Sequence, residues 1–356
     1  MPNAYPTTVT VNVGALSIED VVAVARYGAQ VEIAPAALEE VAATRERVEE
    51  LAQDPTPVYG ISTGFGALAR RHIPEEMRAQ LQLSLVRSHA AGTGPEVEEE
   101  VIRALMLLRL STLCTGRTGV RPVVVETYAK ALNAGIVPVV REYGSLGCSG
   151  DLAPLAHCAL ALLGEGEVRV NGELQDAGEA LAAAGIEPLQ LREKEGLALI
   201  NGTDGMLGQL CLAITDLRAA AKTADIATAM TVEGLLGTLV VFADDLQQLR
   251  PHPGQADAAA NILQVAEGSE ILEAALEEFK KNQVQDAYSV RCAPQVAGGF
   301  RDTLTHTAQV AERELAAAVD NPVVTKDGRV VSNGNFHGAP VALSLIHISE
   351  PTRLGM

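Results

Sequence analysis

The sequence predicts a mainly α protein in which a smaller N-terminal α+β region precedes a bundle of long helices. Two observations indicate this class. Hydrophobic residues make up 47% of the 356 residues but aromatic residues only 3%, and an apolar composition rich in Ala and Leu favours helices over strands. Apolar residues also recur three or four positions apart over long stretches. We expect the N-terminal region over residues 1–200 and a central helical bundle over 201–342.

The N-terminal region begins with two segments of helical pattern. Ser17 has the residue type of an N-cap, and Gly28 would end the helix that it begins. A second helical period runs from Pro35 to about Gln53. Further helices are expected over residues 75–91, 96–114, 121–134 and 151–163.

Two other segments of this region have different patterns. The stretch between Pro57 and Gly66 is rich in glycine and predicts a loop. Residues 168–174 alternate around Asn171-Gly172, which predicts a small β-hairpin. This is the one clear strand signal in the middle of the chain.

The central region continues with long helices. The sequence from Thr203 to Arg250 is rich in Ala and Leu with acidic residues at intervals, as in the middle of a bundle. A linker around residues 251–254 follows, and residues 326–329 predict a turn. Between them, helices are expected over residues 256–266, 269–281 and 300–320.

Charge and cysteine content argue against several classes of function. The net charge of −18 disfavours nucleic acid and anionic membrane surfaces as partners. The five cysteines are odd in number and include no Cys-x-x-Cys pair, so neither a metal site nor a disulfide framework is predicted. The N-terminus lacks a basic segment followed by an apolar core, and no apolar stretch reaches the roughly 18 residues of a membrane span. We expect a cytoplasmic protein.

The run from Gly144 to Asp151 reads Gly-Ser-Leu-Gly-Cys-Ser-Gly-Asp and contains the parts of a self-made electrophile. If the chain bends tightly there, the amide nitrogen of Gly150 can attack the carbonyl of Cys148. Loss of two waters then leaves a five-membered ring whose methylidene derives from Ser149. Gly150 suits the attacking position because it has no side chain to block the approach.

Residues after this run read as the opening of a helix, with Asp151 as its N-cap and Pro154 in its first turn. Two other interpretations of the run stand beside cyclisation. It could be an ordinary turn followed by a helix cap. A hydrolase nucleophile in a Gly-x-Ser-x-Gly elbow is excluded, because position 151 is Asp where the elbow requires Gly.

The run from Gly144 to His157 resembles the signature of the aromatic amino acid lyases, which use a 4-methylidene-imidazol-5-one group made by this cyclisation. The first residue of the cyclising triplet is most often Ala in that family and is Cys148 here. The resemblance runs from about Val22 to Ala342. It implies an L-aspartase/fumarase-like long-helix bundle, a prosthetic group formed from Cys148, Ser149 and Gly150 with no external cofactor, and a homotetramer whose sites combine three chains.

The elimination of ammonia requires a base for the β-proton and contacts that hold the substrate. The segment 58–66 matches the family's tyrosine loop, so the resemblance makes Tyr59 the candidate base; a loop tyrosine that packs its ring is the alternative. His89 matches a position that faces the substrate's ring. Histidine-specific members carry the Ser88-His89 pair, which points to L-histidine, although a lone histidine after a helix is more often structural.

Five further residues take roles from the resemblance. Asn201 lies beside the cyclised group and would donate a hydrogen bond from its amide, or it belongs to an Asn-Gly turn. Arg291 would hold the substrate carboxylate with its planar fork; a surface ion pair is the alternative. Gln285 and Tyr288 would orient substrate and electrophile, with Tyr288 counted among the catalytic residues. Phe336 would pack near the ring-forming triplet.

Together these residues imply deamination of L-histidine to trans-urocanate and ammonia. One alternative is a phenylalanine or tyrosine lyase, or an aminomutase. An alternative of another class is an inactive helical scaffold that keeps the motifs without forming the ring.

The resemblance stops near Ala342, where the family continues into further long helices. Residues 343–356 resemble translated sequencing adapter, so we interpret them as a non-native tail and the chain as lacking its C-terminal helices. A family glutamate that contacts the substrate would lie in the missing part. We therefore expect this chain to be weakly active, unstable or inactive; a natural stop codon directly after Met356 would exclude the truncation.

Overall fold

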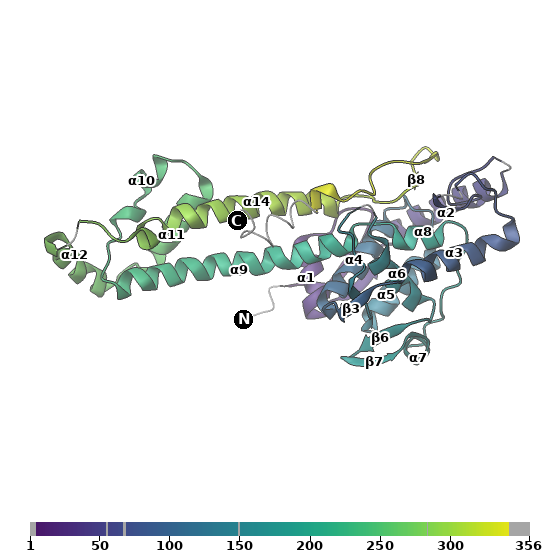
Figure 1. Ribbon diagram of the computed structural model, residues 1–356, viewed down its shortest axis with the longest axis horizontal. Helices are drawn as coiled ribbons and strands as arrows, with labels where there is room; N and C mark the ends of the chain where they lie inside the picture. The colour runs from purple at the N-terminus through teal and green to yellow at the C-terminus, as the bar shows by residue number, and fades with distance from the viewer. Residues whose placement is uncertain (1–4, 55, 67–68, 149, 283, 342–356) are drawn as a thin grey trace. The chain divides into compact units, whose positions relative to one another are not determined.

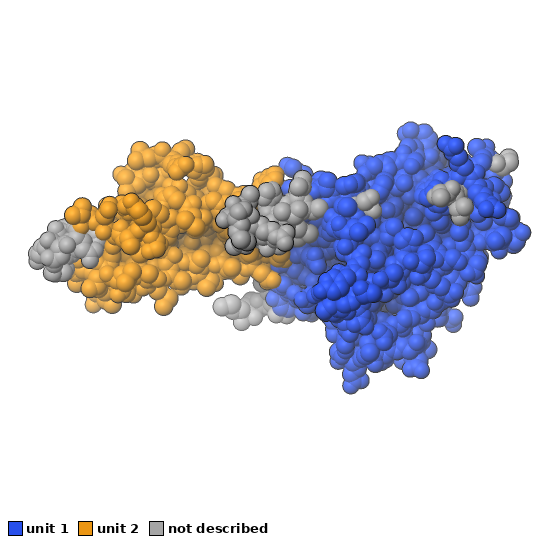
Figure 2. Space-filling view, in the orientation of Figure 1, with its two compact units in different colours: residues 1–212, 310–356 blue, residues 213–309 orange. Residues whose placement is uncertain are grey.

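The computed structural model describes residues 5–54, 56–66, 69–148, 150–282 and 284–341. They belong to two compact units, one made of residues 1–212 with 310–356 and the other of residues 213–309 (Figure 2). The chain leaves the first unit within helix α9 (Asp204–Gly234) and returns within helix α14 (Ala293–Leu315). The predicted domain boundary at residue 200 and the non-native tail stay predictions.

The predicted helices of the first unit are present, with small differences at their ends (Figure 1). They are α1 (Ile18–Tyr27), α2 (Pro35–Gln53), α3 (Glu75–His89), α4 (Glu99–Cys114), α5 (Pro122–Asn133) and α6 (Leu152–Leu162). Two short helices, α7 (Ala177–Ala183) and α8 (Glu195–Ile200), were not predicted, because two turns or fewer give no clear periodicity.

Local signals explain the best-predicted ends. Ser17 caps α1 in a reciprocal capping box with Asp20, and Gly28 ends the helix in the left-handed conformation. Helix α4 is buried on every side from Ala104 to Cys114, so it forms the centre of this unit's core.

The strands of the first unit are short. The predicted hairpin is confirmed as β6 (Glu167–Val170) and β7 (Glu173–Asp176), which turn through left-handed Asn171 and Gly172. The other strand pairs were not predicted, although the predicted turn at 326–329 is confirmed between β8 (Val323–Val324) and β9 (Val330–Val331). These pairs are β1 (Thr8–Val11) with β2 (Gln30–Ile33) in parallel, and the antiparallel β3 (Thr93–Glu96) with β5 (Arg141–Tyr143), β4 (Ile136–Pro138) with β6, and β8 with β9.

The second unit consists of helices. The single long pattern predicted for 203–250 ends at Gly234, and the chain continues as two short helical turns. Its elements after α9 are η2 (Val240–Phe242), α10 (Asp244–Gln248), α11 (Pro253–Val265), α12 (Glu270–Asn282), α13 (Tyr288–Arg291) and α14. A core of buried residues from several of these helices includes Val232, Phe242, Ile262 and Leu272.

One described segment corrects the expectation about apolar stretches. Residues Glu195–Gly234, which include α8 and α9, are long and apolar enough to cross a membrane by length and composition alone. Of the most apolar window in this segment, 83% is buried inside the protein. Buried helices of this kind are also found at the core of globular domains.

We expect iodoacetamide to modify two of the five cysteines in the native protein. Cys148 and Cys292 are half-buried, whereas Cys114, Cys158 and Cys211 are buried. Burial raises the pKa of the Cys114 and Cys211 thiols to about 12 and also raises that of Cys158. Because the thiolate is the nucleophile, the buried thiols should react at least about 100-fold more slowly.

Peptide mass spectrometry after brief labelling measures this difference, with urea-unfolded protein as the control in which all five thiols react. Equal labelling of all five in the folded protein would show that the core described here is open.

Candidate active site

The predicted cyclising segment lies in a tight turn before helix α6. The Asp151 amide donates a hydrogen bond to the Cys148 carbonyl at 3.1 Å. Gly150 between them is buried and has a φ of +81°, a conformation that glycine adopts without strain. Ser149 lies outside the described residues. The described part of the segment thus has the sharp bend that ring closure requires.

Asp151 occupies the predicted N-cap position of α6, but it does so without a side-chain cap bond. Its backbone has a φ of +29°. Its carboxylate instead accepts hydrogen bonds from the Ser145 hydroxyl at 2.7 Å and the Leu146 amide at 2.8 Å. The pKa of the Asp151 carboxyl is raised by burial, against the effect of these bonds. Asp151 therefore ties the start of the loop to its end.

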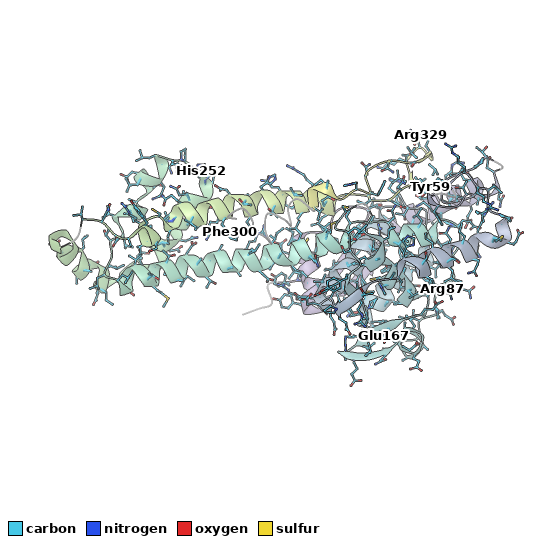
Figure 3. The ribbon with its side chains drawn as sticks, in the orientation of Figure 1. Tyr59, Arg87, Glu167, His252, Phe300 and Arg329 are labelled. Carbon is cyan, nitrogen blue, oxygen red and sulfur yellow. The ribbon has the colours of Figure 1, made fainter. Side chains whose placement is uncertain are left out.

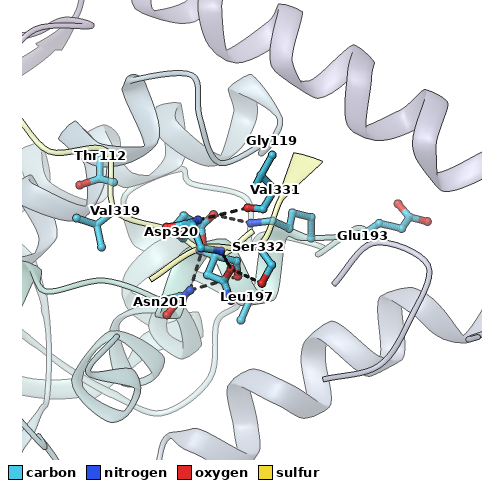
Figure 4. A network of polar contacts seen from close by, with 12 residues as sticks. Thr112, Gly119, Glu193, Leu197, Asn201, Val319, Asp320, Val331 and Ser332 are labelled. Atoms are coloured by element: carbon cyan, nitrogen blue, oxygen red, sulfur yellow. Dashed lines mark hydrogen bonds and ion pairs between the residues drawn. The ribbon is translucent and has the colours of Figure 1, made fainter. Parts of the chain in front are cut away.

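Asn201 lies beside Gly150, as predicted, but presents the opposite end of its amide. Its Nδ2 donates to Asp320 Oδ1 at 3.2 Å and to the Asn321 carbonyl at 3.3 Å (Figure 4). Its Oδ1 faces Gly150 so closely that a Cβ at position 150 would overlap it. Both amide hydrogens are thus in use, and the amide oxygen is the atom that faces Gly150. The predicted donor role of Asn201 stays a prediction.

The backbone around Asn201 is held as well. The Gly202 amide donates to the Gly150 carbonyl at 3.0 Å. The fully buried Arg109 of α4 donates to the Asn201 carbonyl at 2.9 Å and to the Val319 carbonyl at 3.1 Å. Helix α4, the end of α8 and the segment before β8 therefore meet at the candidate site.

Four buried charged residues in this region were missed by the sequence analysis. Lys194 and Asp320 are fully buried and form an ion pair at 2.5 Å. Arg109 lies 3.5 Å from Asp204 at the start of α9. The pKa of Asp204 is raised by burial, against the effect of Arg109. No local pattern distinguishes these charges from surface charges, since their partners lie about a hundred residues away.

The tyrosine loop packs against the same elements. Tyr59, which Figure 3 labels, is half-buried. Its ring meets that of Phe65 edge to face, with centroids 6.2 Å apart. Gly60 has a φ of +73°, and a Cβ there would lie 3.1 Å from Leu197 Cδ2 of α8 and 3.7 Å from Pro322. The loop is thus held near α8, the helix that Asn201 follows.

His89 is the last residue of α3 and is half-buried. Its Nδ1 lies 2.8 Å from the Leu85 carbonyl oxygen and 3.1 Å from Ser88 Oγ. Because a carbonyl oxygen only accepts, Nδ1 carries the proton in the first contact, and a neutral ring leaves Nε2 as an acceptor.

The segment after His89 adjoins the cyclising loop. The Gly92 amide donates to His157 Nε2 at 3.0 Å, and a Cβ at Gly144 would lie 3.0 Å from Gly92 Cα. The pKa of His157 is lowered, mainly by burial, which favours the neutral ring that accepts this bond. The signature run thus contains a structural histidine whose role the sequence analysis did not assign.

The loop that contains Phe336 also reaches this region. Phe336 itself is half-buried. A Cβ at Gly338 would lie 2.6 Å from Thr203 Cγ2 and 2.7 Å from Met206 Cε. The Met206 sulfur lies 3.9 Å from the Cβ position of Gly147, so one methionine of α9 contacts both loops.

The remaining predicted residues belong to the second unit. Arg291 Nη1 donates to Gln285 Oε1 at 2.7 Å, and its guanidinium carbon lies 4.4 Å from the centre of the Tyr288 ring. Tyr288 is 72% exposed. The structure therefore brings the predicted residues together in two groups, one within each compact unit.

The sequence matches the model of the family described as aromatic amino acid lyase over residues 16–349. This match extends past Ala342, where the sequence analysis placed the end of the resemblance. Histidine ammonia-lyase of Streptomyces coelicolor is 62% identical over 339 residues, which cover 95% of this chain and 66% of that protein. The histidine ammonia-lyase of Gloeobacter violaceus is 47% identical, with 92% and 64% covered. The chain thus spans about two thirds of the length of these curated relatives.

Solved structures show the same fold. Tyrosine aminomutase from Streptomyces globisporus superposes with a TM-score of 0.89 at 38% identity, covering 96% of this chain and 68% of that one. Histidine ammonia-lyase from Trypanosoma cruzi superposes with a TM-score of 0.86 at 37% identity, covering 96% and 63%. These likenesses confirm the predicted mainly α fold with long helices.

Proposed function

Because this chain belongs to the aromatic amino acid lyase family, we propose that it acts within an enzyme that eliminates ammonia from L-histidine to give trans-urocanate. The observation that carries the proposal is the 62% identity to a histidine ammonia-lyase over 95% of the chain. The Ser88-His89 pair supports the choice of substrate. When Nδ1 of a neutral His89 donates its hydrogen to the Leu85 carbonyl, Nε2 can accept a hydrogen bond from an imidazole N–H.

The prosthetic group would be a 4-methylidene-imidazol-5-one made from Cys148, Ser149 and Gly150, with no external cofactor. The described residues fit it. The Asp151 amide closes the turn onto Cys148, and the space beside Gly150 admits no side chain. When formed, this group supplies the electrophile that makes the substrate's amine a leaving group.

Ring closure balances without a redox partner. The Gly150 nitrogen bonds to the Cys148 carbonyl carbon while its proton passes to the carbonyl oxygen. The resulting hydroxyl leaves as water with the Ser149 amide proton. The Ser149 hydroxyl then leaves as a second water with the hydrogen of Ser149 Cα.

The remaining residues would bind the substrate and move its proton. Tyr59 takes the β-proton. It is half-buried in a loop that packs on α8, and this position suits a base that acts in a site shielded from water. Arg291 holds the carboxylate, with Gln285 already bonded to one of its nitrogens. Tyr288 orients the reacting groups, and Phe336 packs near the ring.

The assembly that we propose is a homotetramer in the cytoplasm, with no nucleic-acid or membrane partner. Tyr59 and Asn201 belong to one compact unit, whereas Tyr288 and Arg291 belong to the other. This division of the predicted residues supports active sites that combine residues from several chains. The net charge of −18 suits a protein that does not bind nucleic acid.

A tyrosine-specific aminomutase is the second candidate, because the Streptomyces globisporus enzyme superposes with a TM-score of 0.89. A scaffold that never forms the ring is the non-enzymatic alternative. Assays with L-histidine, L-tyrosine and L-phenylalanine side by side distinguish the enzymes by their products.

We expect the purified chain to weigh two waters less than its sequence, with the deficit in the peptide that contains Ser149. We expect turnover with L-histidine alone, although weak for this chain. A chain that lacks two waters but turns over L-tyrosine would show that the substrate is L-tyrosine. A chain of full mass with no turnover would support the non-enzymatic scaffold.

A further inference from the structure

The amide of Asn201 can adopt only one of its two orientations. Its Nδ2 faces two acceptors, the carboxylate of Asp320 and the carbonyl of Asn321, at 3.2 and 3.3 Å. A flipped amide would place Oδ1 against both acceptors and leave three oxygens without a hydrogen between them. The side-chain oxygen of Asn201 is therefore directed at Gly150 by its partners on the other side.

Asp320 is itself fixed by charge. Its Oδ1 accepts from Asn201 Nδ2 and from the Asn321 amide at 2.7 Å, while its Oδ2 receives Lys194 Nζ at 2.5 Å. Asp320 and Lys194 are both 0% exposed, so no water replaces either partner. Burial lowers the pKa of Lys194, and the Asp320 carboxylate opposes that shift. Each charge thus depends on the other to remain in place.

Gly150 is consequently held at two points. The Gly202 amide holds its carbonyl at 3.0 Å, and the Asn201 oxygen occupies the space where a side chain would begin. With these contacts in place, Gly150 has a φ of +81°, which lies in the left-handed region. The orientation of the Asn201 amide is thus transmitted directly to the residue whose nitrogen must attack Cys148.

We propose that Lys194 and Asp320 are a buried positioning pair that fixes the Asn201 amide with its oxygen toward Gly150, and that closure of the ring depends on this orientation. The inference rests on the proposed function, because it assigns a role in forming that function's prosthetic group. The hydrogen bonds of Lys194 and Asp320 among the described residues go to one another, to Asn201 and to Asn321, so the pair acts through Asn201.

Three variants test the pair: Lys194→Met, Asp320→Leu, which removes the acceptor of the Asn201 amide, and the double variant. Intact mass gives the fraction of each purified chain that has lost two waters, and thermal unfolding gives its stability. We expect each single variant to be less stable and to lower that fraction at least about tenfold. The double variant leaves no buried charge unpaired and should regain stability, while its water loss stays low because Asn201 has lost its anchor. If a single variant does not fold, the double variant carries the test.

Arg121→Met is the matched control. It removes the ion-pair partner, at 2.8 Å, of the fully buried Glu195. Glu195 directly follows Lys194 in the chain, but its ion pair with Arg121 does not involve Asn201. We expect lower stability and unchanged water loss.

Water loss that recovers with stability in the double variant, or that falls equally in the control, would overturn the positioning role and leave the proposed function intact. A native chain of full mass would contradict the proposed function and, with it, this inference.

Discussion

Replacing Gly150 with alanine is expected to abolish the loss of two waters from residues 148–150. The added Cβ would overlap the Asn201 oxygen, which cannot withdraw because its amide nitrogen is bonded to Asp320 and Asn321. An alanine also disfavours the φ of +81° that Gly150 adopts. We expect the fraction of chain with the mass deficit to fall at least about 100-fold, as measured by intact mass and peptide mapping.

Gly147→Ala is the control within the same loop. Gly147 also has a positive φ, of +63°, but among the described residues its Cβ position meets only the Met206 sulfur, at 3.9 Å. Alanine there should cost about 1–2 kcal/mol of stability through its backbone conformation and leave ring closure largely intact. Equal loss of the mass deficit in both variants would mean that backbone freedom, and not the space beside Asn201, decides cyclisation.

Replacing Arg109 with methionine is expected to lower the free energy of unfolding by about 3–5 kcal/mol. The guanidinium is fully buried and joins the Asn201 and Val319 carbonyls to Asp204. Its loss leaves Asp204 as a buried carboxylate whose pKa burial has already raised, so the variant must bury an unpaired charge or keep the group protonated. Urea unfolding followed by circular dichroism measures the change.

Arg103→Met in the same helix is the control, because the hydrogen bonds that Arg103 donates within the described part of the chain go to the neutral Val24 carbonyl. Its loss should cost about 0.5–1.5 kcal/mol. Similar costs for the two arginines would show that Arg109 contributes ordinary hydrogen bonds and that Asp204 does not need its charge.

The parts of the fold that the sequence analysis predicted well rest on interactions between near neighbours. The capping box of Ser17 and Asp20 spans three residues, and the hairpin at Asn171-Gly172 depends on two residues that tolerate a positive φ. The paired strands that were missed are two to four residues long, so that no alternation develops. Except for β8 and β9, which a short turn joins, their partners lie elsewhere in the chain, as when β3 pairs with β5.

The candidate site divides in the same way. The resemblance predicted a cyclising triplet with Tyr59 and Asn201 beside it, and the structure places Asn201 beside Gly150. Asp151 fits the residue preference of an N-cap, yet its carboxylate bonds to Ser145 and Leu146 instead. The preference of Asp for N-caps predicts only a bond to nearby backbone amides of the helix. In the folded protein, donors of the preceding loop bind this carboxylate in place of those amides.

By itself the sequence determined the helical class, most helix ends and the family, because periodicity, caps and motifs are properties of neighbouring residues; the cyclising turn stays a prediction. Only the tertiary structure decided which end of the Asn201 amide faces Gly150. That choice is made by Asp320 and Lys194, which lie 119 and 7 positions from Asn201 and 126 from each other. A buried charge is stable only beside its partner, and no local pattern in the chain reveals where that partner will be.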